Sequence, residues 1–197
     1  MPKYPEKMRE MISETVRNSI HQAGIELIRE AGWNAFTTER IAERAGVSRG
    51  VLYNYFANKE AIARSILDAS FNEQNRKLDE LANHPGSATD RLRAMAAFLV
   101  ENFLSQRELH RTVMDHLPPP GHDGAPPPVD LFKRRDAIFE RVLIAGVKSG
   151  EFAVADPAAA VLLLGGGLHE LCMRSFFDGR TPRVKPLIDI FLKGIAC

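Results

Sequence analysis

The sequence predicts an all-α protein of about nine helices, and three observations support this fold class. Apolar residues recur at spacings of three and four along most of the 197 residues, as in helices with one buried face. Glycines and prolines fall between these periodic segments, where they end helices. Residues that cap helix N-termini, such as Ser48 and Asp156, stand where several of the segments begin.

A first long helix runs to about Ala31, and Gly32 ends it. Its apolar stripe faces a small core that it shares with the next two helices. The residues expected in that core are Leu27, Phe36, Ile41, Leu52 and Phe56, and Val51 is also expected to point inward. This core would fix the angle between the second and third helices.

Two short helices follow on either side of a tight turn. Thr37 or Thr38 can cap the first of them. Gly46 permits the turn, because positive φ is cheap for glycine, and Ser48 can cap the second helix, which runs to Tyr55. Because the outer side of this helix is polar, the segment has the pattern of a helix-turn-helix, whose second helix enters the major groove of DNA. The alternative is a pair of ordinary core helices with a solvated face.

Six further helices are expected. The fourth, from Asn58 to about Asn83, leaves the N-terminal unit, so we expect a DNA-binding domain over residues 1–57 and a second domain over 58–197. The remaining helices are expected at about 88–105, 107–117, 129–149, 157–177 and 183–195. The proline-rich segment 117–128 cannot be helical, because proline lacks the backbone N–H, and is predicted to be a surface loop.

Composition sets limits on the setting and partners of the protein. The net charge is +1, and residues 1–65 carry 10 Lys and Arg against 8 Asp and Glu, so nucleic-acid binding would depend on a local face. Cys172 and Cys197 fit no disulfide framework or zinc spacing, which favours a reducing cytoplasm. We expect no membrane partner, because the most apolar run, 158–168, is far shorter than the ~20 residues of a bilayer span.

Enzymatic and metal motifs are incomplete. His169-Glu170 begins like a zinc-protease helix, but Met173 stands where the second histidine is needed. His110, Asp115 and His116 lack the spacing of a helical metal pair. The run 165–167 of three glycines would weaken an isolated helix by roughly 1 kcal/mol each, so it indicates close helix approach there. It does not fit a phosphate loop, because no strand precedes it. The sequence therefore predicts no catalytic site, no metal site and no cofactor.

The N-terminal segment resembles the TetR family of one-component transcriptional regulators. The residues that carry the resemblance, across roughly 20–67, are Gly32, Trp33, Phe36, Thr37, Thr38, Ile41, Ala42, Ala45, Gly46, Val47, Ser48, Gly50, Leu52, Tyr53, Tyr55, Phe56, Lys59 and Glu60. Many relatives have a histidine in place of Tyr55 and a tyrosine in place of Trp33, and both replacements keep an aromatic ring. Beyond residue 67 the resemblance is mainly one of helix count and order.

The resemblance implies a DNA-binding role for one set of residues. Those expected to hold phosphates of a double-stranded operator are Thr37, Thr38, Tyr53, Tyr55 and Lys59, and those expected nearest the bases are Ser48, Arg49, Gly50 and Asn54. Lys59 supplies charge that any DNA sequence attracts. Arg49 can reach guanine O6 and N7 bidentately, and Gly50 lets the backbone approach the duplex.

The resemblance also implies a homodimer and a small-molecule effector. The residues expected between subunits are Leu164, Leu168, Leu171, Leu187, Phe191 and Ile195, from the last two helices. Those expected to line an apolar effector pocket are Phe98, Phe103, Met114, Phe132, Phe139, His169, Met173 and Phe177, although each one alone also fits plain core packing. The function this predicts is a repressor that its effector releases from DNA, by favouring the DNA-incompetent spacing of the dimer. The alternatives are an activator, a ligand-independent regulator, or a helical binding protein or enzyme without DNA binding.

Overall fold

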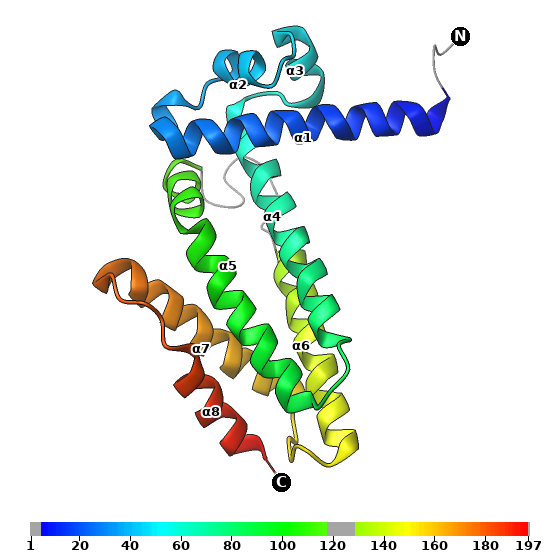
Figure 1. Cartoon of the computed structure of the whole chain (residues 1–197), viewed down its shortest axis with the longest axis vertical. Helices are drawn as coiled ribbons and strands as arrows, with labels where there is room; N and C mark the ends of the chain where they lie inside the picture. The colour runs from blue at the N-terminus through cyan, green and yellow to red at the C-terminus, as the bar shows by residue number, and fades with distance from the viewer. Residues whose placement is uncertain (1–4, 118–128, 197) are drawn as a thin grey trace. The chain divides into compact units, whose positions relative to one another are not determined.

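The structure, a computed structural model, describes residues 5–117 and 129–196. The helices in that part of the chain are α1 (Glu6–Ala31), η1 (Trp33–Ala35, a 3₁₀ turn), α2 (Thr38–Arg44), α3 (Arg49–Tyr55), α4 (Lys59–Ala82), α5 (Ala88–His116), α6 (Val129–Ser149), α7 (Pro157–Asp178) and α8 (Val184–Ile195) (Figure 1). Within these residues, β pairing is limited to one isolated bridge between Phe152 and Ala196. The all-α prediction is confirmed.

The chain forms two compact units. The first comprises residues 5–70 with 107–117, and the second comprises 71–106 with 129–196, among the described residues. Helices α4 and α5 each contribute to both units. The expected functional division at residue 57 stays a prediction, because packing alone does not test which residues bind DNA or a ligand. The predicted proline-rich loop, at 118–128, lies outside the described residues.

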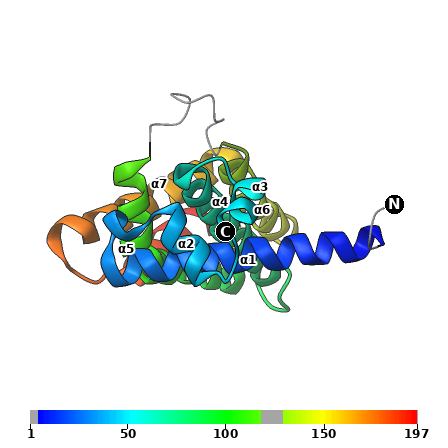
Figure 2. The ribbon, with the colours of Figure 1, turned by 90° about the horizontal axis from the view of Figure 1, so that it is seen from above.

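The core of the first unit is the one the sequence predicts. Leu27, Phe36, Ile41, Leu52 and Phe56 are all buried. Figure 2 shows α2 and α3 beside α1, whose N-terminal part extends past them. Val51 differs from expectation, since 36% of its surface is exposed. Its position on α3 explains this: Leu52 and Phe56, four residues apart, share the buried face, whereas Val51 is turned about 100° from Leu52.

Local chemistry sets the turn between α2 and α3. Thr37 caps α2 by accepting a hydrogen bond from the Arg40 backbone N–H at 3.4 Å. Gly46 has a φ of +70°, a conformation that favours glycine. Ser48 caps α3, with its Oγ accepting from the Val51 N–H at 3.2 Å. These caps hold two helices of only seven residues each at defined starting points.

In the second unit, helix α5 is continuous where the sequence analysis expects two helices, at 88–105 and 107–117. That expectation is wrong because Ser105, Gln106 and Arg107 contain neither glycine nor proline, so the chain continues its helical hydrogen bonding. The Ser105 hydroxyl points back to donate to the Asn102 carbonyl at 2.9 Å. The apparent break reflects a change of buried face, since Leu109 and Val113 lie about half a turn round the helix from Val100.

Helices α4 to α8 surround the core of the second unit, in which α7 packs against α6 and α8 (Figure 1). Polar contacts fasten its connections. The Glu151 carboxylate accepts from the backbone N–H groups of Ala88 and Thr89, at 2.9 and 3.1 Å, and so caps α5. These hydrogen bonds, that of Ala88 first, hold the pKa of Glu151 below its usual value. Asp156 caps α7 above Pro157, as predicted.

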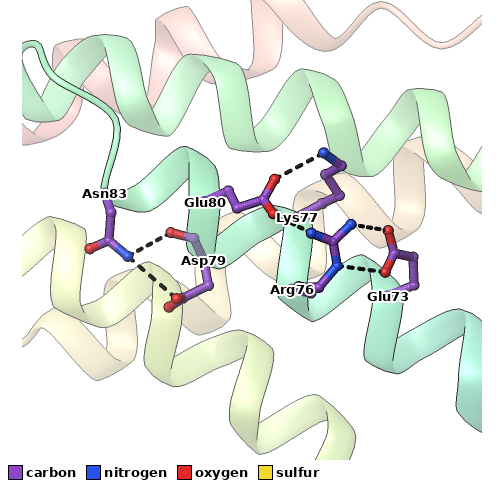
Figure 3. A network of polar contacts seen from close by, with 6 residues as sticks. All are labelled: Glu73, Arg76, Lys77, Asp79, Glu80 and Asn83. Carbon is purple, nitrogen blue, oxygen red and sulfur yellow. Dashed lines mark hydrogen bonds and ion pairs between the residues drawn. The ribbon is translucent and has the colours of Figure 1, made fainter. Parts of the chain in front are cut away.

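The outer side of α4 in this unit carries a ladder of ion pairs (Figure 3). Arg76 bonds Glu73 through Nε at 2.7 Å and also pairs with Glu80, which accepts from Lys77 at 2.9 Å. Asp79 receives the Asn83 amide and, at 2.6 Å, the Arg141 guanidinium from α6. The i, i+3 and i, i+4 pairs stiffen the helix, and the Arg141 contact joins it to α6.

Candidate nucleic-acid interface

Helix α3 presents a polar face to solvent over a buried apolar one. Leu52 is fully buried, while 46% of Tyr53 is exposed. The other exposed residues at this face are Ser48, Arg49, Gly50 and Asn54, all predicted near the bases. A short helix held by its inner face with polar side chains outside is suited to enter a groove in DNA.

A chain of polar contacts links α2 to α3 on this face. The Thr38 Oγ1 lies 3.2 Å from the Tyr53 hydroxyl oxygen and donates to Glu39 Oε2 at 3.3 Å. The other Glu39 oxygen accepts from Arg49 Nη2 in an ion pair. The hydrogen bond of the Glu39 backbone N–H, followed by the charge of Arg49, lowers the pKa of Glu39, so its carboxylate stays ionised.

Thr37 and Ser48 offer hydroxyl donors on the same side. Each side-chain oxygen already accepts a capping hydrogen bond, from the N–H of Arg40 and of Val51 respectively. A hydroxyl that accepts a hydrogen bond still has its own proton to donate. The Ser48 cap can therefore stabilise its helix and bind a phosphate oxygen at the same time, whereas the Thr37 hydroxyl also hydrogen-bonds the Glu39 carboxylate.

Tyr55 and Lys59, like Thr37 and Thr38 among the predicted phosphate ligands, are half-buried. The Lys59 ammonium lies 4.8 Å from the ring centroid of Trp33, which stacks on Phe36 and His116 at 5.0 and 4.9 Å. Such cation–π contacts hold the ammonium without neutralising it. The indole therefore sets where the charge of Lys59 lies.

Helix α1 supports this surface from behind. The Arg17 guanidinium lies 5.5 Å from the Tyr55 ring centroid and 5.3 Å from that of Phe56. His21 Nε2 lies 2.9 Å from Ser65 Oγ of α4. Burial, assisted by the positive charge of Arg17, lowers the pKa of His21, so the neutral imidazole fits this contact.

Two exposed residues beside this polar face are absent from the predicted DNA-binding set. Val51 is exposed, and an isopropyl group there can contact the thymine methyl in the major groove. The helical period measured from Leu52 and Phe56 would have identified it. Glu39 lies in the first turn of α2, where a negative charge suits the helix dipole. Its pairing with Arg49 joins two helices, and no local pattern signals it.

The expected effector-pocket residues that the structure describes differ in how deeply they are buried. Phe139 is buried in the core of the second unit, and Phe98 and Phe103 are half-buried against it. Phe132 is exposed and makes an edge contact with Phe71 at 5.7 Å. On α7, His169 is exposed and Met173 half-buried, while the side chains of Met114 and Phe177 lie outside what the structure describes.

A surface groove between α4 and α5 does contain one of these residues. Its volume is about 510 Å³, and Phe98, Leu81, Ala94 and Ala97 give it apolar walls. The charged or polar lining residues are Lys77, Glu80, His84 and Glu101. Lys77 and Glu80 bond each other in the ladder of Figure 3, so this side of the groove is already an ion pair.

The expected interface residues separate into two groups. Leu164, Leu168 and Phe191 are buried within the core of their own subunit. Leu171, Leu187 and Ile195 are half-buried, and one Leu187 methyl lies 3.2 Å from where a Cβ on Gly167 would be. The most exposed leucines and isoleucine are others: Leu162, Leu163 and Ile190, at 70, 72 and 74%. They make α7 and α8 apolar on a side that the described chain leaves uncovered.

Neither a metal nor a membrane site is evident in the part of the chain that the structure describes. Within 5–117 and 129–196, no three His, Cys, Asp or Glu side chains lie together as metal ligands. Over the same residues, no helix combines the length and the apolar character required to cross a bilayer.

Comparison with known families decides what this arrangement belongs to. A family model described as bacterial regulatory proteins of the tetR family matches residues 20–66, and the tetracycline repressor-like C-terminal domain matches residues 85–173. The chain belongs to the TetR family. As a TetR-family protein it is a DNA-binding transcriptional regulator, a class of proteins distinct from enzymes.

Individual relatives agree with the TetR assignment. The class A tetracycline repressor from transposon 1721 of Escherichia coli is 27% identical over 153 residues, which are 78% of this chain and 66% of the repressor. The HTH-type regulator YfiR of Bacillus subtilis is 28% identical over 188 residues, 89% of each chain. A TetR/AcrR-family regulator from Thermobifida fusca has the same fold, with a TM-score of 0.73, 24% identity, and 90 and 97% of the two chains covered.

Proposed function

We propose that this TetR-family protein is a homodimeric repressor that binds a double-stranded operator through α3 and is released by a small apolar effector. The observation that carries the proposal is the bare polar face of α3, where Arg49 and Asn54 are exposed above a buried Leu52. Repression is supported by the sequence relative named as a tetracycline repressor. An activator would bind the same DNA but raise expression from it.

In this proposal the residues of the face divide by role. Phosphates are held by Thr37, Thr38, Tyr53, Tyr55 and Lys59, and bases are approached by Ser48, Arg49, Gly50 and Asn54. Support comes from chemistry: the hydroxyls and the ammonium are donors that suit an acceptor-only phosphate. Arg49 has the planar donor fork that suits a guanine edge.

Dimerisation through α7 and α8 would cover the exposed Leu162, Leu163 and Ile190. Large exposed aliphatic side chains grouped on two helices are costly in water, and a second copy would bury them against the same residues of itself. Of the interface residues expected from sequence, Leu171, Leu187 and Ile195 would add their remaining exposed surface. The two α3 helices of such a dimer would lie about 34–36 Å apart, one turn of DNA.

The effector is proposed to bind the second unit. An apolar wall beside a few polar groups is the usual composition of a small-molecule site. Phe98, with its half-buried ring in the groove between α4 and α5, is the pocket candidate with open space beside it. A ligand acts by binding one spacing of the dimer better than the other, so its affinity must change when DNA is bound.

The proposal is tested by equilibrium binding to the duplex upstream of the protein's own reading frame and to a random duplex of equal length. Arg49→Ala should reduce the preference for the upstream duplex about 5- to 150-fold, the range for one bidentate base contact, with less effect on random DNA. Lys59→Ala should weaken binding to both duplexes. It should also reduce the slope of log affinity against log salt concentration by about 1. Salt-independent or absent binding by the wild type would leave the helical binding-protein alternative.

A further inference from the structure

The polar chain on the DNA-facing side ends on one carboxylate. Thr38 donates its single hydroxyl proton to Glu39 Oε2, since a carboxylate can only accept. The contact of 3.2 Å between Thr38 and Tyr53 must therefore use the tyrosine proton. The Glu39 Oε1 accepts from Arg49 Nη2. Two helices thus direct their donors at Glu39, which is fixed at the second position of α2.

A phosphate oxygen would compete for these same donors. Like a carboxylate, a phosphate is an anion that accepts hydrogen bonds, and its pull on Arg and hydroxyl groups is independent of DNA sequence. When Arg49 swings to a phosphate, it must leave Glu39. That step exposes an unpaired carboxylate beside a polyanion, which makes the random complex weaker.

A guanine edge makes a different demand on Arg49. The guanidinium has five N–H donors in a fixed fork, and Glu39 takes one of them, on Nη2. The remaining donors can address O6 and N7 while the ion pair stays formed. The side chain is then held in one orientation before it meets the base, which reduces the ordering cost of the contact.

We propose that Glu39 is a specificity-determining positioning residue that aims Arg49 at guanine and holds it back from phosphates. This rests on the proposed function, in which Arg49 reads a base. Glu39 itself touches no base. It acts through Arg49, and secondarily through the Thr38–Tyr53 hydroxyl pair, of which it accepts the Thr38 proton until a phosphate in the correct register replaces it.

The test is selection of bound sequences from a randomised duplex library by the full-length wild type, Glu39→Gln and Glu43→Gln. Glutamine keeps the size of the side chain and removes its charge, and Glu43 provides the same charge change on the same exposed helix. Glu39→Gln should lose preference at one guanine per half-site, and its ratio of specific to random affinity should fall about 1.5- to fivefold. Glu43→Gln should keep the wild-type preference.

A double-mutant cycle makes the assignment to Arg49 decisive. In an Arg49→Ala background, the loss of discrimination caused by Glu39→Gln should disappear, because there is no guanidinium left to aim. An equal loss in both backgrounds would overturn the proposal, as would an unchanged preference in Glu39→Gln or the same change in Glu43→Gln. If the wild type selects no sequence, the proposed function fails too; if it selects one that Glu39→Gln shares, only the role of Glu39 fails.

Discussion

Replacing Gly24 by alanine should destabilise the first unit, although alanine is the better helix former. Gly24 lies in the interior of α1 and is buried. A Cβ added there would lie 2.8 Å from Phe36 Cε2 and 3.0 Å from Ile66 Cδ1. The contact with Phe36 is closer than carbon atoms tolerate, and that with Ile66 is tighter than most carbon contacts. Because Phe36 is fully enclosed, its ring has no free space to move into.

The magnitude follows from two opposing effects. An alanine in a helix interior is favoured over glycine by about 1 kcal/mol. An extra methyl group in a packed core costs about 1–3 kcal/mol through displaced side chains and backbone. The steric cost of the added methyl group therefore exceeds the gain in helix propensity by about 1 kcal/mol. A loss of stability of this size lowers Tm by about 2–4 °C for a protein of this length.

Gly50→Ala is the matched control, because it lies in the same unit and its added Cβ meets only Ser48 Oγ, at 3.9 Å. Thermal unfolding should show Gly50→Ala as stable as the wild type or more so, and Gly24→Ala less stable. Below the unfolding transition, Gly50→Ala should bind DNA more weakly than Gly24→Ala, because under the proposed function the added methyl group would lie between α3 and the duplex. A rise in Tm for Gly24→Ala equal to that of the control would refute the packing argument.

Three further predictions concern pH and assembly. Burial lowers the folded-state pKa of His21 below its usual 6.5, so near that pH the unfolded state binds more protons than the folded state. The free energy of unfolding should therefore fall as pH drops below about 6.5. In urea titrations at a series of pH values, His21→Gln should show a flatter dependence of stability on pH. The pKa of Glu151 is also lowered, so the stability that its capping of α5 contributes should be fully present above about pH 4.5 and lost as pH falls further. The difference in free energy of unfolding between the wild type and Glu151→Gln should therefore narrow below that pH. Leu163→Glu should convert the dimer to a folded monomer in sedimentation experiments, whereas Ile144→Glu, at an exposed site on α6, should remain a dimer.

Features governed by neighbouring residues could be predicted from sequence. Gly46, Ser48 and Asp156 each act within a few residues of their own position, and the structure has the turn and both caps where expected. The five-residue core of the first unit follows from helical period, which needs no knowledge of distant contacts. The extra helix break near Gln106 arises because one helix buries different faces in two units, and a sequence pattern records only the change of face.

Contacts between distant residues could not be predicted in this way. The stacking of His116 on Trp33 joins positions that are far apart in the chain, and the ion pair of Arg49 with Glu39 crosses a turn. Each depends on how helices pack, which small differences in many weak contacts decide. The interface residues show the same limit. The apolar pattern of α7 and α8 does not distinguish residues of the core from residues of the exposed side. Packing decides, and it buries Leu164 in the core and leaves Leu163 exposed.

Helices α2 and α3, with seven residues each, are too short to be stable alone, because isolated helices need roughly 12–15 residues to be marginal in water. Their geometry must come from the enclosed side chains beneath them, chiefly Phe36 and Leu52. Apart from the exposed contacts that end on Glu39, the polar face has no contact that supports the fold and that DNA binding would have to break. DNA can therefore compete for those few exposed contacts while the support beneath stays fixed. This separation would let a single carboxylate tune specificity, by keeping or losing its pair with Arg49, without unfolding the motif.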